Sequence, residues 1–512
     1  MRPIFWVLLF LLAGELAAQD APTYYRDVAP VLERNCVTCH QKGQIGPMPL
    51  TGYDEVAAYG QMIHYVTAEK LMPPWLAEKP AGVFEDEKQL SEQEIDLLKR
   101  WLDAGMPPGD STGIKTLLPP NPPFLTDPDT IFRMAESFEQ YGVYYDQYRV
   151  FSIPTNLPED RYVSHIEFVP GNPDIVRGAH ISIDTGDKVV PLDEWDPQYG
   201  YFSFGELGFV PEESRWYNWY PGRTRTEVGP RAARLLPAGA KLLLHIHYGP
   251  TGVPQPDRSE IRLKFAEKVP DHLVRTLPLH HPASMTNDTF YLPAGERTRV
   301  HASIELPFPT RIYALQPHGH FLASQWQIFA TLPEQRRGEV LLQIDEWDFH
   351  HKQKFLLRKP LDLPAGTLLH TLAEYDNTSE NLFNPNDPPR AMHWGKRMYE
   401  EMFLVFFDLV PLNDPFLSGF QILSHPANVT GDQFRIKVAL NRSDRLSVEL
   451  FSFSGEIHQK ISEKQKFSAG VREITIPVGG LVSGNYYVRI SDKAGRQVCV
   501  PFYRNVGDDF RG

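Results

Sequence analysis

The sequence predicts a multidomain protein in which one small helical domain precedes several β-sandwich domains. The chain has 512 residues, which corresponds to roughly three or four domains of ordinary size. Its 46 prolines and 36 glycines favour short strands joined by rigid loops over long helices. Hydrophobic residues make up 42% and charged residues 22% of the chain, a composition that excludes wholesale disorder.

Charge and cysteine content narrow the class of protein further. The 64 acidic and 51 basic residues give a net charge of −13, which argues against a nucleic-acid partner. Three cysteines allow at most one disulfide, so the chain is not a disulfide-stapled scaffold. The 18 histidines offer many potential metal ligands.

The N-terminus has the features of an export signal over residues 1–18. Arg2 is followed by the apolar run Ile4–Leu12 and by small residues suited to cleavage near Ala18. A membrane anchor would need about 20 apolar residues, roughly twice this run. We therefore expect an exported protein, periplasmic, at the cell surface or secreted, with no transmembrane segment in the mature chain.

Composition and periodicity divide the remaining chain into a helical domain, a linker and three β domains. Residues 20–112 are expected to be helical, with Ser91 and Glu94 forming a capping box. Residues 113–129 form a proline-rich linker. Alternating apolar and polar segments then predict β-sandwiches over 130–275, 276–411 and 412–512. The clearest of these segments are Tyr148–Ile153, Tyr162–Phe168, Lys241–Tyr248, Phe434–Leu440, Leu446–Phe453, Glu473–Ile476 and Tyr486–Ile490.

The segment Cys36–His40 has the C-x-x-C-H pattern of covalent haem c attachment. The two thiols add to the vinyl groups of the haem, and the adjacent histidine becomes an axial iron ligand. A redox dithiol would not need the histidine. A zinc site would need a second ligand pair, which Cys499 alone cannot supply.

The second axial haem ligand is expected to be Met72, with Met48, Met62 and Met106 as alternatives. A thioether at this position suits electron transfer, although a methionine can equally fill a core. The segments Cys36–His40, Gly46–Leu50 and Met72–Trp75 resemble the cytochrome c domain fused to bacterial copper monooxygenase-like proteins. This resemblance implies a small all-α domain and favours Met72.

His318 and His320 form an H-x-H pair that could bind one metal from the same face of a strand. Two such imidazoles fit copper or zinc, and an additional methionine would favour Cu(I). Many isolated H-x-H pairs are, however, surface or core histidines.

The sequence following this pair resembles the catalytic domain of the type II, ascorbate-dependent copper monooxygenases, the family of the peptidylglycine hydroxylating and dopamine β-monooxygenases. The resembling segments are Trp347–Phe349, Tyr375–Thr378, Asn384-Pro385, Trp394-Gly395 and Glu400–Met402. The resemblance implies two jelly-roll-like domains and an oxygen-binding copper held by His318, His320 and Met402.

A second, electron-transfer copper of that family is expected only in altered form. His247 matches one of its three histidine ligands, but Arg177 and Gly178 stand where the resemblance would place the other two. His180 and His245 each lie two residues from a family ligand position and could rebuild the site together with His247. Alternatively, this copper has been lost. The adjacent pairs His280-His281 and His350-His351 are expected in loops or at the surface.

Residues from about 413 resemble the export-sorting domain of the type IX secretion pathway. The resembling segments are Leu450–Gly455, Phe467–Gly470 and Leu481–Ile490. The resemblance implies that the type IX secretion machinery is a partner. Generic fibronectin-like sandwiches can carry similar segments.

Together these features predict an exported haem–copper monooxygenase that hydroxylates a C–H bond with dioxygen. Its cofactors would be covalent haem c and one or two coppers. Its substrate would be a small or peptide-like molecule, and its reductant ascorbate or a redox protein. The alternative is a non-enzymatic electron-transfer or copper-binding protein on a degenerate monooxygenase scaffold.

Overall fold

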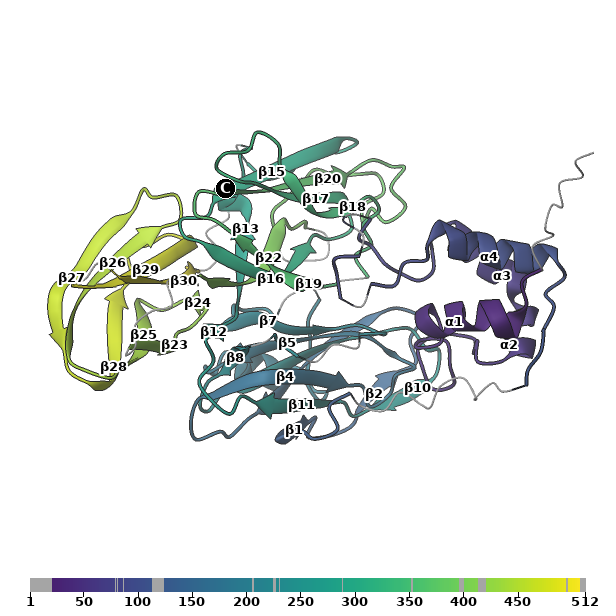
Figure 1. Ribbon diagram of the computed structural model, residues 1–512, viewed down its shortest axis with the longest axis horizontal. Coiled ribbons are helices and arrows are strands. Elements are labelled where there is room, and N and C mark those ends of the chain that lie inside the picture. The colour runs from purple at the N-terminus through teal and green to yellow at the C-terminus, as the bar shows by residue number, and fades with distance from the viewer. Residues whose placement is uncertain are drawn as a thin grey trace, which may run out of the picture. The chain divides into compact units, whose positions relative to one another are not determined.

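The computed structural model describes residues 21–78, 80, 82–85, 87–112, 124–204, 207–223, 227–229, 231–287, 289–350, 353–395, 400–412, 420–493 and 496–506. The expected signal peptide (1–18) and most of the expected linker (113–129) lie outside these residues. The chain divides into two compact units (Figure 1). One is a helical unit that includes residues 21–41, 48–73 and 89–112, and the other is a β unit that contains the remaining described residues.

The helical unit is small and packs around one apolar core. Its helices are the π-helical turn η1 (Tyr24–Val28), α1 (Ala29–Asn35), α2 (Tyr53–Ala58), α3 (Gly60–Ala68) and α4 (Glu92–Asp103). Leu98 and Trp101 of α4 are almost fully buried against Tyr24 and Leu32. The expected capping box is confirmed, because the Glu94 amide donates to Ser91 Oγ and the Ser91 amide donates to Glu94 Oε2.

The first sandwich of the β unit combines a sheet of order β1-β11-β4-β8-β12 with a sheet of order β6-β3-β9-β5-β7. Its strands are β1 (Thr130–Arg133), β2 (Phe138–Tyr141), β3 (Gln147–Pro154), β4 (Arg161–Val169), β5 (Val176–Asp184), β6 (Tyr201–Phe202), β7 (Glu213–Trp219), β8 (Ala232–Leu236), β9 (Lys241–Tyr248), β10 (Pro254–Asp257), β11 (Glu260–Phe265) and β12 (His272–Leu273), with helix α5 (Val190–Trp195) before β6. β2 and β10 form a separate pair. The predicted strands at 148–153, 162–168 and 241–248 are β3, β4 and β9.

The second sandwich combines the sheets β13-β22-β16-β19 and β15-β20-β17-β18, and β14 and β21 form a separate pair. Its strands are β13 (Arg275–His280), β14 (Tyr291–Leu292), β15 (Arg297–Glu305), β16 (Thr310–His318), β17 (Ala323–Thr331), β18 (Glu339–Ile344), β19 (Phe355–Leu363), β20 (Leu368–Asp376), β21 (Met392–His393) and β22 (Leu404–Pro411), with the 3-10 turn η2 (Pro282–Ser284) after β13.

The third sandwich combines the sheets β23-β25-β28 and β24-β30-β29-β26-β27. Its strands are β23 (Phe420–Ser424), β24 (Asn428–Val429), β25 (Gln433–Leu440), β26 (Asp444–Ser452), β27 (His458–Phe467), β28 (Gly470–Pro477), β29 (Gly484–Asp492) and β30 (Gln497–Arg504). The predicted β-rich architecture with sandwich domains is therefore confirmed.

The third sandwich shares a core with the second. Phe453 and Tyr487 both contact Phe308 edge-on, with ring centroids 5.5 and 5.2 Å apart. Asn485 is buried, and its Nδ2 donates to the carbonyl oxygen of Pro278 at 3.1 Å. Cys499 of β30 is also buried, where it packs as a small apolar residue.

A segment expected in the helical domain belongs instead to the β unit. Residues 74–88, where described, pack on the second sandwich. Phe84 forms a β-bridge with Leu357 of β19, and the Glu85 amide donates to the Leu356 carbonyl at 2.7 Å. The buried ring of Phe84 also contacts Phe355. The boundary therefore falls immediately after Pro73, because this apolar segment finds its core in the β unit.

Candidate metal sites

The Cys36–His40 motif follows helix α1 directly in the helical unit. Cys36 caps the helix with its amide bonded to the Leu32 carbonyl at 2.7 Å, and the His40 amide returns to the Cys36 carbonyl at 2.9 Å. His40 Nδ1 lies 3.1 Å from the carbonyl oxygen of Met48. A carbonyl can only accept, so Nδ1 carries the proton and Nε2 carries the lone pair. This tautomer suits iron coordination through Nε2, and the donor set fits the haem.

The four methionines proposed as the second axial ligand lie in different surroundings. Met48 and Met106 are partly buried against the core of the helical unit, whereas the side chains of Met62 and Met72 are 51% and 41% exposed. Met48 thus serves through its backbone carbonyl, the acceptor of His40. The hydrogen bond from His40 to the Met48 carbonyl accounts for Met48 in the motif, and its sulfur need not bind the haem iron.

In the β unit, His318 and His320 lie beside Met402. His318 is the last residue of β16, in register with Leu404 of β22, and His320 lies in the loop that follows. The two imidazole centroids are 5.6 Å apart with their planes at 86°. His318, His320 and Met402 are all at most 1% exposed. The structure thus brings the predicted ligands into one buried place.

Hydrogen bonds to the segment 400–402 hold the His320 imidazole in a defined orientation. His320 Nδ1 lies 2.8 Å from the Glu400 carbonyl oxygen, so the lone pair is on Nε2. Gly319 is required between the histidines, because a Cβ there would lie 2.8 Å from that of Ala323. Two imidazoles and a thioether form a donor set that suits copper, and the residues present fit that metal.

Glu401 organises the loop around these residues. Its carboxylate accepts the backbone amides of His320, of Leu322 at 2.9 Å and of Met402 at 2.8 Å. The side chain is fully buried, and burial raises the pKa of Glu401 to about 7. Tyr375 donates from its hydroxyl to the Met402 carbonyl at 2.8 Å. Glu401 and Tyr375 therefore position the candidate ligands without being ligands themselves.

Aromatic rings from both sandwiches surround the His320 imidazole, a feature the sequence did not reveal. Phe204 and Phe349 contact it edge-on with centroids 6.0 and 5.6 Å away. Phe204 also stacks on Phe349 at 5.2 Å and on Phe321 at 6.0 Å. Phe204 precedes β7 and Phe349 follows β18, so residues far apart in the chain meet beside His320. Contact between loops of two domains leaves no periodic signal in sequence.

The histidines proposed for the second copper lie on neighbouring strands of the first sandwich. His180 of β5 and His245 of β9 are direct cross-strand partners with ring centroids 6.3 Å apart. His180 Nδ1 accepts from Asn218 Nδ2 at 2.7 Å, and His245 Nε2 donates to the Ser203 carbonyl at 2.9 Å. Gly178 stands directly opposite His247, so no side chain faces His247 from that position.

His247 instead contacts Asp146, a residue that no sequence motif marks. Its Nε2 lies 3.0 Å from Asp146 Oδ1, and His350 Nε2 lies 3.7 Å from the other carboxylate oxygen. Tyr148 stacks on the His247 ring at 4.5 Å. Among the residues that the structure describes, no group of three or more His, Cys, Asp or Glu side chains is arranged to hold a metal ion.

The expectation that His280 and His281 lie in a loop or at the surface is wrong for His280, which ends β13 and is buried. His281 lies in the loop between β13 and η2, as expected, but its side chain is only 3% exposed. His280 lies within hydrogen-bonding distance of Thr371 Oγ1 and, at 3.1 Å, of the Leu369 carbonyl oxygen, and His281 packs on Tyr503. Burial lowers the pKa of His280 to about 3 and that of His281 to about 4, so both are neutral core histidines. Of the other pair, His350 is partly exposed and His351 lies outside the described residues.

Comparison with known proteins yields no family assignment. No protein-family profile and no curated protein matches the chain. Among solved structures, a β-D-mannosidase from Dictyoglomus thermophilum aligns at 10% identity over 41% of this chain and 29% of its own, with a TM-score of 0.13. A β-1,2-glucanase from Parabacteroides distasonis aligns at 11% identity over 41% and 31%, also with a TM-score of 0.13. The chain thus spans less than a third of either protein, and scores this low assign neither fold nor activity.

Within the described part of the chain, no helix is long and apolar enough to cross a membrane. The longest, α4, has 12 residues.

Proposed function

We propose that the protein is an exported haem–copper monooxygenase that hydroxylates a C–H bond of a small or peptide-like substrate. The supporting observation is the contact between His320 and Glu400, 80 positions apart, which sets the segment 318–320 against the segment 400–402. The resemblance to type II copper monooxygenases draws its three copper ligands from these same two segments.

His318, His320 and Met402 would hold the copper. When bound there, copper would supply dioxygen activation and insertion of one oxygen atom into the substrate. The chain's own residues prepare this place: the Glu400 carbonyl fixes the tautomer of His320, and the Glu401 carboxylate fixes the loop. Phe204 and Phe349 shield the His320 ring from water.

Cys36 and Cys39 would attach a haem c, and His40 and Met72 would bind its iron. The haem would supply electrons, taken from ascorbate or from a redox protein outside the chain. His40 contributes its fixed tautomer, held by the Met48 carbonyl. We also propose that the protein is exported and that the type IX secretion machinery recognises it.

The test is metal analysis of the purified protein combined with one matched pair of variants. We expect one tightly bound copper per covalent haem, lost in His318→Ala and kept in His458→Ala, a variant of an exposed histidine of β27. Stopped-flow reoxidation of the reduced haem by dioxygen should slow only in His318→Ala. Equal copper content and equal reoxidation rates in both variants would contradict the proposal.

A non-enzymatic electron-transfer or copper-binding protein is the second candidate. The hydrogen bond between His247 and Asp146 favours it, because the family's electron-transfer copper would need that imidazole. The same experiment separates the two. Copper that is lost in His318→Ala while haem reoxidation stays as fast as in His458→Ala would favour this candidate.

A further inference from the structure

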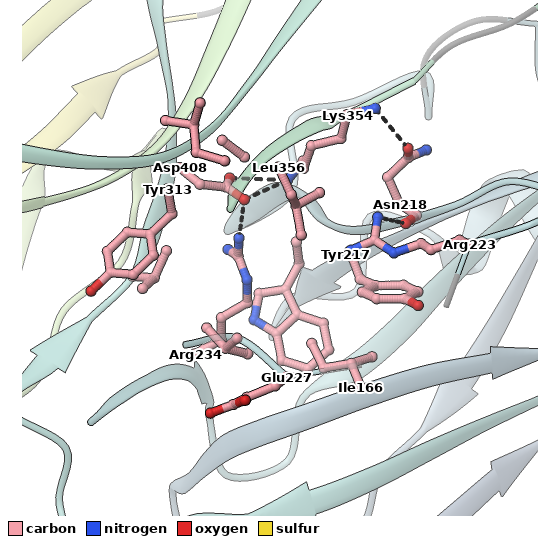
Figure 2. Close-up of a pocket in the computed structure, with 15 residues that line it drawn as sticks. Ile166, Tyr217, Asn218, Arg223, Glu227, Arg234, Tyr313, Lys354, Leu356 and Asp408 are labelled. Atoms are coloured by element: carbon pink, nitrogen blue, oxygen red, sulfur yellow. Dashed lines mark hydrogen bonds and ion pairs between the residues drawn. The ribbon is translucent and has the colours of Figure 1, made fainter. Parts of the chain in front are cut away.

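A small pocket with a cavity volume of about 40 Å³ lies between the first and second sandwiches. It is bounded by strands β4, β7, β8, β16, β19 and β22 (Figure 2), and none of the proposed metal ligands lines it. Ile166, Val274 and Leu356 contribute apolar wall, whereas Lys354 and Asp408 contribute charge. The proposed monooxygenase function assigns no role to this pocket.

The charged wall belongs to a buried network that joins the two sandwiches. Lys354 Nζ donates to both oxygens of Asp408, at 2.9 and 3.1 Å, and Arg234 pairs with the same carboxylate (Figure 2). Arg234 also reaches Glu213 at 3.3 Å, and the other oxygen of Glu213 accepts from Arg275 at 3.0 Å. All five residues are only 2–5% exposed.

This network carries one more positive than negative charge. Lys354, Arg234 and Arg275 are cations, and Asp408 and Glu213 are the two carboxylates. The lining adds one charge of each sign, the guanidinium of Arg223 over the Tyr217 ring and the exposed carboxylate of Glu227. A buried charge without a counter-charge is costly, so one monovalent anion in the pocket would stabilise the network.

The lining also offers a hydrogen-bond donor that needs an acceptor. Trp216 of β7 is fully buried, and its Nε1 has no hydrogen-bond partner within the described part of the protein. A buried indole N–H normally finds an acceptor. A carboxylate oxygen is a strong acceptor for such a donor.

We propose that this pocket binds a small monoanionic organic acid, whose carboxylate accepts from Trp216 Nε1 and balances the excess charge around Lys354. The apolar part of the acid lies against Ile166, Val274 and Leu356. Because the pocket lies between sandwiches, the bound acid stabilises their association.

The test uses propionate as the probe, titrated into the full-length protein by calorimetry and thermal unfolding at constant ionic strength. We expect saturable binding and a raised Tm with propionate but not with propionamide, which has the same shape without the charge. Equal responses to propionate, propionamide and added sodium chloride would overturn the proposal.

Variants identify the site. Trp216→Phe keeps the ring, removes the N–H and should weaken propionate binding about tenfold. The same change at Trp326, a buried indole that does not line the pocket, should leave affinity unchanged. Unchanged affinity in Trp216→Phe would exclude this site. If that variant does not fold, Lys354→Met makes the same test, because it removes the excess charge and should abolish binding. None of these outcomes depends on bound copper or haem.

Discussion

The carbonyl oxygen of Glu400 lies 2.8 Å from Nδ1 of His320, and this contact fixes which nitrogen of the imidazole carries the lone pair. The adjacent Glu401 carboxylate accepts the amides on both sides of the contact. One dipeptide therefore sets both the tautomer of a candidate ligand and the path of its loop. Positioning of this kind is what metal ligands require from their surroundings.

Glu401→Ala should destabilise the protein by at least about 2 kcal/mol, because the amides of His320, Leu322 and Met402 lose their buried acceptor. Glu401→Gln should lie between Ala and wild type, since its amide keeps one carbonyl oxygen. Chemical unfolding measures the effect, and Glu346→Ala at an exposed position is the control. An Ala variant as stable as wild type would show that Glu401 does not organise the loop.

Met72→Ala should convert a six-coordinate, low-spin haem into a high-spin haem, if Met72 is the second axial ligand. Met48→Ala should leave the spin state unchanged, because His40 is held by the backbone carbonyl of residue 48. Met62→Ala, at a similarly exposed methionine, tests one of the alternative ligands and should also leave the spin state unchanged. The visible absorption spectrum reports all three, and a spectrum unchanged by Met72→Ala would transfer the assignment to another methionine.

Periodicity and a capping box predicted seven of the strands and helix α4, because these elements carry a local signal in the sequence. The strand predicted over 241–248 has the bounds of β9, and Ser91 caps α4 as expected. Contacts between segments far apart in the sequence had no such signal. Asp146, just before β3, meets His247 of the neighbouring strand β9, and Phe204 meets His320 of another sandwich. The burial of His280 was not predicted, because its partner Thr371 lies on another strand. The prediction that Met402 joins His318 and His320 as a copper ligand rested on the family resemblance and not on the spacing of these residues.

Lys354 should make stability depend on pH in a predictable direction. Burial lowers its pKa to about 8 against the attraction of Asp408, while Arg234 and Arg223 lower it further. Between about pH 8 and 10.5 the unfolded chain keeps the lysine proton and the folded protein releases it. The unfolded state then binds more protons, so this group makes the free energy of unfolding rise with pH.

The comparison with Lys354→Met isolates this contribution. Relative to the variant, wild type should gain up to about 3 kcal/mol between pH 8 and 10.5 and show no change below pH 7. In wild type, deprotonation of Lys354 above pH 8 should also weaken propionate binding. Urea unfolding of both proteins across this range gives the measurement, and parallel pH profiles would contradict the shifted pKa.

Asn485 tests whether the third sandwich is part of the folded body or a detachable tail. Its buried Nδ2 donates to the carbonyls of Pro278 and Leu279 in β13, at 3.1 and 3.3 Å. Asn485→Ala leaves two buried carbonyls without this donor and should cost about 1–3 kcal/mol. Because Phe453 and Tyr487 share a core with Phe308, the loss should lower one common unfolding transition of the second and third sandwiches. Scanning calorimetry of Asn485→Ala against Asn441→Ala, at an exposed turn, makes the comparison. Two separate transitions, with only the weaker one shifted, would mean that the third sandwich folds independently and can be removed after export.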